Sequence, residues 1–243
     1  MTADLTLAIE TSNPSAQAVA PGERGGPGVA LGVVRGRWDV EAIAVEPLAP
    51  TARHDDDLMP AIDRLFARAG ADPAAVRRVA VSVGPGGYTA LRVAVAAGKM
   101  IAEAAGGTCI AVPTALCLAL RAPADLPEPI GVLLASKADT AWCCVLGPGW
   151  RDDPGAAARG RVIGAADVQG LGAASLIGDR FVPESIRARA SELGIAIVEP
   201  RYDPAACLEA ASALEAIDPA LLVPIYPREP DAVTLWRKLH GGA

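Results

Sequence analysis

Apolar residues occur along the chain in short runs that alternate with longer segments of helical spacing. In the first half, runs typical of strands lie at residues 5–9, 29–34, 38–45, 79–83 and 108–112. The second and third runs are joined by Arg35 and Gly36, which predicts an antiparallel hairpin. Apolar residues recur every three to four positions over 55–70 and 89–105, which predicts two helices. This half is therefore predicted to form a βββαβαβ lobe.

A proline-bearing stretch, 121–129, leads into a second half of similar organisation. Strands are predicted at residues 130–135, 142–146, 175–177 and 195–198, and helices at 183–193, 204–217 and 231–239. We predict an α/β fold of two lobes, each a mixed β-sheet flanked by helices. The lobes are assigned to residues 1–112 and 113–223, and residues 224–243 to a C-terminal tail with a short helix.

Composition excludes several classes of function. The 243 residues carry a net charge of −6, which argues against a large basic face that grips nucleic acid, so any tRNA contact is expected to be indirect. The five cysteines form no Cys-x-x-Cys pair, which argues against a zinc site or a disulfide framework. The N-terminus lacks the pattern of a signal peptide and no apolar run approaches the length of a membrane span, so we expect a cytoplasmic protein.

The most informative motif is a glycine turn between the strand at 79–83 and the helix that follows. Gly84, Gly86 and Gly87 allow positive φ angles or a close backbone approach, and Thr89 is placed to cap the helix. Free N–H groups at a helix N-terminus bind anions, so the turn is a candidate phosphate site. A tight strand-to-helix turn without a ligand would use the same residues.

Glu10, Thr11 and Ser12 form a second candidate, a cluster of oxygen-bearing side chains at the exit of the first strand. Such a cluster can hold a metal or a phosphate, or it can make local hydrogen bonds within the turn. Together with the three glycines it defines a vestigial phosphate site.

Catalytic chemistry has little support in the sequence. His54 precedes three aspartates, but the second of the two histidines is His240, at the far end of the chain, so a helical two-histidine metal site is excluded. A Ser-His-Asp hydrolase is improbable for the same reason. We therefore assign no catalytic residue and no metal ligand.

The helix predicted over 89–105 is unusually slim, because alanine and glycine fill many of its positions. Small residues allow helix backbones to approach closely. The helix is therefore either an interhelical interface with another subunit or fully internal to the lobe.

Three segments and a C-terminal motif together resemble the TsaB family. They are Leu7-Ala8-Ile9-Glu10-Thr11-Ser12, Arg53-His54 through Leu58-Met59-Pro60-Ala61-Ile62-Asp63, Val83-Gly84-Pro85-Gly86-Gly87-Tyr88-Thr89-Ala90-Leu91-Arg92-Val93, and Pro224-Ile225-Tyr226-Pro227-Arg228. The likeness is specific over about the first 120 residues. It implies an ASKHA fold, that of the actin, sugar-kinase and Hsp70 superfamily.

The resemblance also implies a function. TsaB proteins are non-catalytic partners of TsaD in making N6-threonylcarbamoyladenosine beside the tRNA anticodon, and TsaE supplies an ATPase. This chain would then be a pseudoenzyme scaffold, without a cofactor of its own, that binds and activates a TsaD-like protein. A homodimer through the same helices is the other assembly expected. The partner surface of the family comes from the two helices of the first lobe, which implies an interface at Leu58, Ile62, Phe66, Leu91, Ala94, Val95, Gly98 and Ile101.

The sequence departs from the family pattern at several positions, including Glu10 in place of aspartate and an insertion at residues 16–28. These departures make ATP binding doubtful. The alternative function is an ATP-dependent ASKHA phosphotransferase that uses the glycine turn for phosphates and Glu10 or Asp139 near magnesium. A metallopeptidase would need ligands that the sequence lacks.

Overall fold

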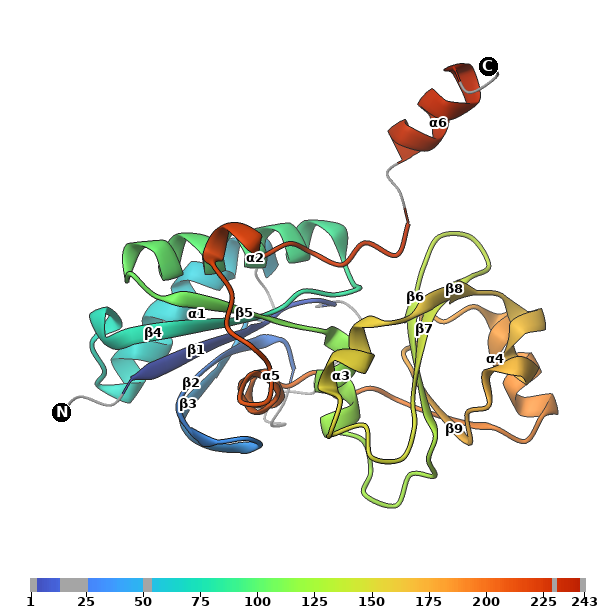
Figure 1. Ribbon diagram of the computed structural model, residues 1–243, viewed down its shortest axis with the longest axis horizontal. Coiled ribbons are helices and arrows are strands. Elements are labelled where there is room, and N and C mark those ends of the chain that lie inside the picture. The colour runs from blue at the N-terminus through green and yellow to red at the C-terminus, as the bar shows by residue number, and fades with distance from the viewer. Residues whose placement is uncertain (1–3, 14–25, 50–53, 229–230, 241–243) are drawn as a thin grey trace.

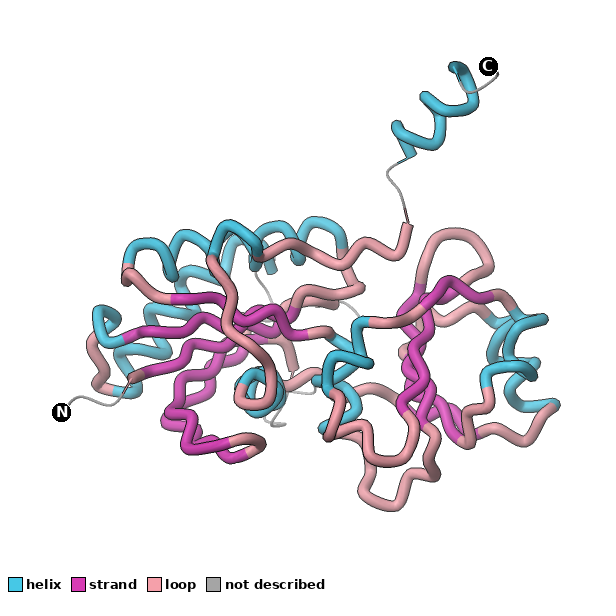
Figure 2. Tube along the Cα trace, in the orientation of Figure 1, coloured by secondary structure: helices cyan, strands magenta, loops and turns pink. Residues whose placement is uncertain are grey.

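The computed structural model describes residues 4–13, 26–49, 54–228 and 231–240. The insertion expected at residues 16–28 lies largely outside the described residues. Two lobes lie side by side, each built on a five-stranded mixed sheet (Figure 1). The tube in Figure 2 shows the two sheets as separate groups of strands with helices around them. The predicted α/β architecture is confirmed.

The first sheet has the strand order β3-β2-β1-β4-β5. Its strands are β1 (Leu5–Glu10), β2 (Gly28–Gly36), β3 (Asp39–Pro47), β4 (Val76–Ser82) and β5 (Thr108–Val112). β1 pairs with β2 antiparallel and with β4 parallel, so it lies at the centre of the sheet and all six of its residues are buried. The hairpin turn falls at Arg37–Trp38, two residues later than Arg35 and Gly36, because pairing continues to Gly36 and Asp39.

Two helices, α1 (His54–Ala69) and α2 (Tyr88–Ala104), cover one face of this sheet (Figure 1). Gly98 brings α2 directly onto β4, since a Cβ atom there would lie 2.5 Å from Cγ2 of Val81. The two helices and the sheet enclose one core cluster, which includes Leu7, Leu65 and Val79. The 3₁₀ turn η1 (Pro73–Ala75) leads from α1 into β4.

The opposite face of the first sheet is covered by α5 (Pro204–Ala211), a helix from the second half of the sequence. α5 was expected to run to Ile217 and to belong to the second lobe. It ends at Ala211, and the backbone of Ile217 instead pairs with that of Cys109 on β5, which requires an extended chain. The chain thus returns to the first lobe before its C-terminal tail begins.

The second sheet has the strand order β10-β9-β6-β7-β8. Its strands are β6 (Ile130–Ala135), β7 (Ala141–Leu146), β8 (Arg161–Ile163), β9 (Ser175–Gly178) and β10 (Ala196–Val198). The helical elements around it are α3 (Thr114–Leu120), η2 (Pro154–Ala158), η3 (Ala165–Leu171) and α4 (Glu184–Glu192). α4 and η3 cover one face, while α3 packs between the lobes against α5. One core cluster continues from Ala8 of the first sheet to Val132 of the second.

After α5 the chain passes through η4 (Pro219–Leu221), runs along α2 and continues to α6 (Asp231–His240). Figure 1 shows α6 standing away from both lobes. Within the described residues, no helix has the length and apolar character required to cross a membrane.

Candidate functional site

The two candidate phosphate segments meet at the carboxyl ends of β1 and β4. The carbonyl oxygen of Ser12 accepts a 2.6 Å hydrogen bond from the backbone N–H of Gly87, the residue that caps α2. A Cβ atom on Gly86 would lie 2.8 Å from the carbonyl carbon of Ser12 and closer still to its oxygen. Position 86 therefore requires glycine, because the backbone of Ser12, just after β1, lies in contact with it. The chain's own backbone uses the Gly87 N–H group that the phosphate hypothesis assigned to a ligand.

Gly84 serves a different purpose in the same turn. Its φ angle is +100°, in the region that favours glycine, and a side chain there would meet Cδ1 of Leu91. Its carbonyl accepts from the N–H of Thr114, while the neighbouring Val83 carbonyl accepts from the N–H of Ile225 in the tail. Thr89 does not cap the helix as predicted, because α2 begins one residue earlier and Gly87 takes the cap position.

Glu10 is sealed inside the protein. It has no exposed surface, and its Oε1 accepts hydrogen bonds from the backbone N–H of Ser12 at 2.9 Å and from the Ser12 hydroxyl at 2.6 Å. Oε2 is also buried, and it accepts no hydrogen bond from the residues that the structure describes. Burial raises the pKa of Glu10, although the bonds from Ser12 lower it. Ser12 and Thr11 are buried as well, so this cluster closes the strand-exit turn by local hydrogen bonds.

A polar contact between the lobes was missed by the sequence reasoning. The side-chain amide of Asn13, just after the Glu10 turn, donates to Oδ2 of Asp179 at 2.9 Å and to the hydroxyl of Tyr202 at 3.2 Å. Asp179 follows β9 in the second lobe and is fully buried, which raises the pKa of its carboxyl. No local signal joins residues that lie more than 160 positions apart. The contact ties the exits of β1 and β9 together between the lobes.

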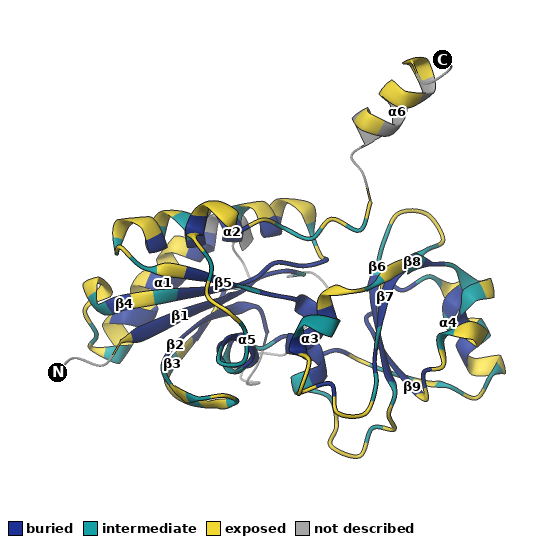
Figure 3. Ribbon diagram, in the orientation of Figure 1, coloured by how far each residue is buried: buried dark blue, intermediate teal, exposed yellow. Residues whose placement is uncertain are grey.

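The eight predicted interface residues lie on the two predicted helices, but they face inward. Leu58, Phe66, Leu91 and the other buried members belong to the core beneath α1 and α2, and Ile101 is partly buried against it. Figure 3 shows the division along each helix, with buried positions toward the sheet and exposed positions away from it. These side chains stabilise the monomer, so a partner would contact the opposite side of the helices.

The outward side of α2 combines small and apolar residues with the exposed charged side chains of Arg92 and Glu103. Ala96, Met100 and Ala104 are exposed, and 72% of Met100 is accessible to solvent. On the neighbouring α1, Met59 is 51% exposed. We name this exposed side of α1 and α2 the outer helical surface. Small side chains there leave room for the backbone of another helix to approach.

The stretch from Ala220 to Tyr226, which leads into the C-terminal tail, extends the outer helical surface. Lys99 on α2 donates from Nζ to the carbonyl of Ala220 at 3.0 Å, which fixes the tail beside the helix. Leu221 and Val223 are exposed there. At the N-terminus of α2, the rings of Tyr88 and Tyr226 lie 5.6 Å apart between centroids, and the Arg92 guanidinium lies 4.8 Å from the centre of the Tyr88 ring. Exposed aromatic and arginine side chains are typical of binding hot spots.

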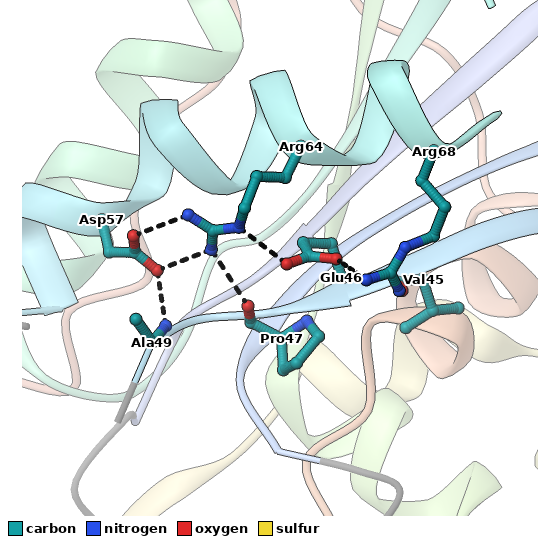
Figure 4. Close-up of polar contacts among 7 residues, drawn as sticks. All are labelled: Val45, Glu46, Pro47, Ala49, Asp57, Arg64 and Arg68. Carbon is teal, nitrogen blue, oxygen red and sulfur yellow. Dashed lines mark hydrogen bonds and ion pairs between the residues drawn. The ribbon is translucent and has the colours of Figure 1, made fainter. Parts of the chain in front are cut away.

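An ionic network holds α1 to the edge strand β3 (Figure 4). Arg64 pairs with Glu46 at 2.7 Å and with Asp57 at 3.0 Å, and Arg68 pairs with Glu46 at 2.7 Å. The carboxylates of Glu46 and Asp57 are buried, whereas the arginines reach solvent. Buried carboxylates require such partners, so the network fixes the orientation of α1.

Metal binding finds no support in the described part of the chain, where no three His, Cys, Asp or Glu residues lie close enough together to hold a metal ion. The side chains of His54, Asp55 and Asp56 lie outside the described residues. The five cysteines are buried and form no disulfide, and burial raises the pKa of Cys143 and of Cys144 to about 12. Thiols in that state are poor nucleophiles. Asp139, the other residue considered for magnesium, is exposed on the turn between β6 and β7.

This architecture is similar to that of known proteins. The family model of TsaD, the tRNA N6-adenosine threonylcarbamoyltransferase, matches residues 44–146, from the end of β3 to the end of β7. YeaZ from Pseudomonas aeruginosa superposes with a TM-score of 0.61 at 17% identity, covering 92% of this chain and 99% of that one. The chain has the fold of YeaZ, a TsaB protein. The fold that the resemblance to the TsaB family implies is thereby confirmed.

A second solved structure gives the same result. It is the crystal structure of an uncharacterized protein with similarity to peptidase YEAZ from Pseudomonas aeruginosa, with a TM-score of 0.63 and 19% identity over 93% of this chain and 100% of that chain. No curated protein matches the chain. The two mixed sheets and their helices are thus those of an ASKHA-like fold.

Proposed function

We propose that this chain is a non-catalytic, TsaB-like subunit that binds and activates a TsaD-like partner in the formation of N6-threonylcarbamoyladenosine in tRNA. The observation that carries the proposal is the outer helical surface, where Ala96, Met100 and Ala104 of α2 are left open on a YeaZ-like fold. A partner helix can pack at close range where Ala96 and Ala104 are exposed, because their side chains are small. The chemistry of the transfer is assigned to the partner.

The closed strand-exit turn supports this proposal over a phosphotransferase. A sugar-kinase-type reaction needs ionised carboxylates at magnesium and free N–H groups at the phosphates. Here the carboxyl of Glu10 is buried with a raised pKa, and the N–H of Gly87 is bonded to Ser12. ATP is therefore not assigned to this chain.

The remaining partners follow from the same proposal. The net charge of −6 supports a complex in which the main tRNA contacts lie on the TsaD-like protein. A TsaE-like ATPase would join the complex rather than this chain alone. A homodimer would occupy the same outer helical surface and compete with the partner.

The test is a charge introduced on the outer helical surface. Met100→Glu places a carboxylate at a 72% exposed position of α2, so the monomer should fold normally. We expect binding to the TsaD-like protein of the same organism to weaken at least tenfold, since an unpaired charge would be buried in the interface. The control is Phe181→Glu, which removes a 47% exposed aromatic side chain from the second lobe. Equal binding by both variants and the native chain would refute the surface.

A further inference from the structure

The C-terminal helix α6 is amphipathic, and none of its described side chains belongs to a core cluster of either lobe. Figure 1 shows it beyond both lobes, and its described apolar side chains are exposed, with 61% of Trp236 and 70% of Leu239 accessible to solvent. Val233, Trp236 and Leu239 recur at every third position, so they lie along one side of the helix. An isolated helix of ten residues is marginal in water. Its apolar side therefore requires a cover that this chain does not provide in the part described.

The segment that precedes α6, residues 225–228, is held near the N-terminus of α2. The N–H of Ile225 donates to the carbonyl of Val83 at 2.8 Å, in the turn that precedes α2, and the Tyr226 ring contacts that of Tyr88. Arg228 donates from Nη2 to the carbonyl of Lys137 at 3.0 Å, on the turn between β6 and β7. Two residues separate this anchor from the described start of α6. The chain that leads to α6 is therefore held, as far as Arg228, at the N-terminal end of α2 and at the turn between β6 and β7.

We propose that α6 is a docking helix whose apolar side inserts into a groove of the same TsaD-like partner that contacts α1 and α2. This inference rests on the proposed function. It is supported by the exposed apolar side chains of Leu221, Val223 and Tyr226, in the stretch that passes beside α2 before α6. A partner seated on α2 would thus also lie next to α6.

The side chains of α6 indicate which properties a groove on the partner should have. Trp236 supplies a large, exposed ring stacked on His240 at 5.1 Å between centroids, and tryptophan is one of the side chains enriched at binding hot spots. The segment carries Arg237 and Lys238 against the single acidic residue Asp231. The groove should therefore be apolar at its floor and neutral or acidic at its rim.

The experiment measures binding of the full chain to the TsaD-like protein and the hydrogen exchange of α6. We expect Trp236→Ala to weaken binding about 30-fold or more, as for an interface hot spot, and the control Phe181→Ala to leave it unchanged. The amides of α6 should exchange rapidly in the free chain and be protected in the complex. Since α6 stands apart from the lobes, the urea midpoint of the Trp236 variant should equal that of the native chain.

Each outcome separates the inference from the proposed function. If Trp236→Ala binds as tightly as the native chain and α6 stays unprotected, the docking helix is refuted while the subunit role stands. If the native chain itself does not bind the partner, the proposed function fails and the docking helix with it. Protection of α6 that grows with protein concentration in the absence of the partner would overturn the inference in favour of a second copy of this chain.

Discussion

The substitution Gly86→Ala tests whether the glycine turn is closed by the chain's own backbone. The added Cβ would lie 2.8 Å from the carbonyl carbon of Ser12 and nearer to its oxygen, a separation that real Cβ atoms essentially never show. Because the obstacle is backbone, the strand exit and the turn must move apart. Overpacking of this kind costs roughly 1–3 kcal/mol, and loss of the hydrogen bond from Gly87 to Ser12 costs about 1 kcal/mol more. We expect a total destabilisation of about 2–4 kcal/mol.

Urea unfolding of the two adjacent glycine variants provides the assay. At Gly87, which has a φ of −64°, the nearest atom to an added Cβ is the Ser12 oxygen at 3.6 Å, an ordinary contact. We therefore expect Gly87→Ala to stay within about 1 kcal/mol of the native chain, since a poorer helix cap is offset by a less flexible unfolded state. Equal stability of the two variants, with loss of ATP binding in both, would refute the closed turn and favour a phosphate site.

Two further predictions concern buried carboxylates. Burial raises the pKa of Glu10 in the folded state, so the native chain should lose stability as the pH rises above the usual carboxyl value of 4.5. Glu10→Gln should lack that loss, and parallel stability curves of the two proteins against pH would contradict the assignment. Arg64→Met should destabilise the protein by about 1–2 kcal/mol in urea unfolding, because it removes one partner of the buried Asp57 and one partner of the buried Glu46. The exposed pair Arg189–Glu192 is the control, and Arg189→Met should cost less than about 0.5 kcal/mol.

The order of strands and helices could be predicted from the sequence because its signals are local. Buried strands such as β1 read as continuous apolar runs, and α1 ends before Gly70, which adopts a positive φ of +59°. The hairpin turn and the start of α2 were misplaced by one or two residues. Pairing and capping geometry set those boundaries, and neither is visible in composition.

The face that a helix presents was the part that could not be predicted. α2 carries apolar or small residues on both sides, so the inward Leu91 and the outward Met100 look alike in sequence. The sheet decides between them, because Gly98 allows one side to approach Val81. The return of α5 to the first lobe and the contact of Asn13 with Asp179 also depend on long-range packing, for which no local pattern exists.

The central claim is that this chain acts as a subunit, and the mass of its complex tests that claim most directly. The native chain and the TsaD-like protein of its own organism would be mixed and measured by light scattering, with and without ATP. The account predicts a stable heterodimer whose formation needs no ATP binding by this chain. A chain that stays a monomer or homodimer in the presence of the TsaD-like protein, and that binds ATP by itself, would contradict the account and favour the phosphotransferase.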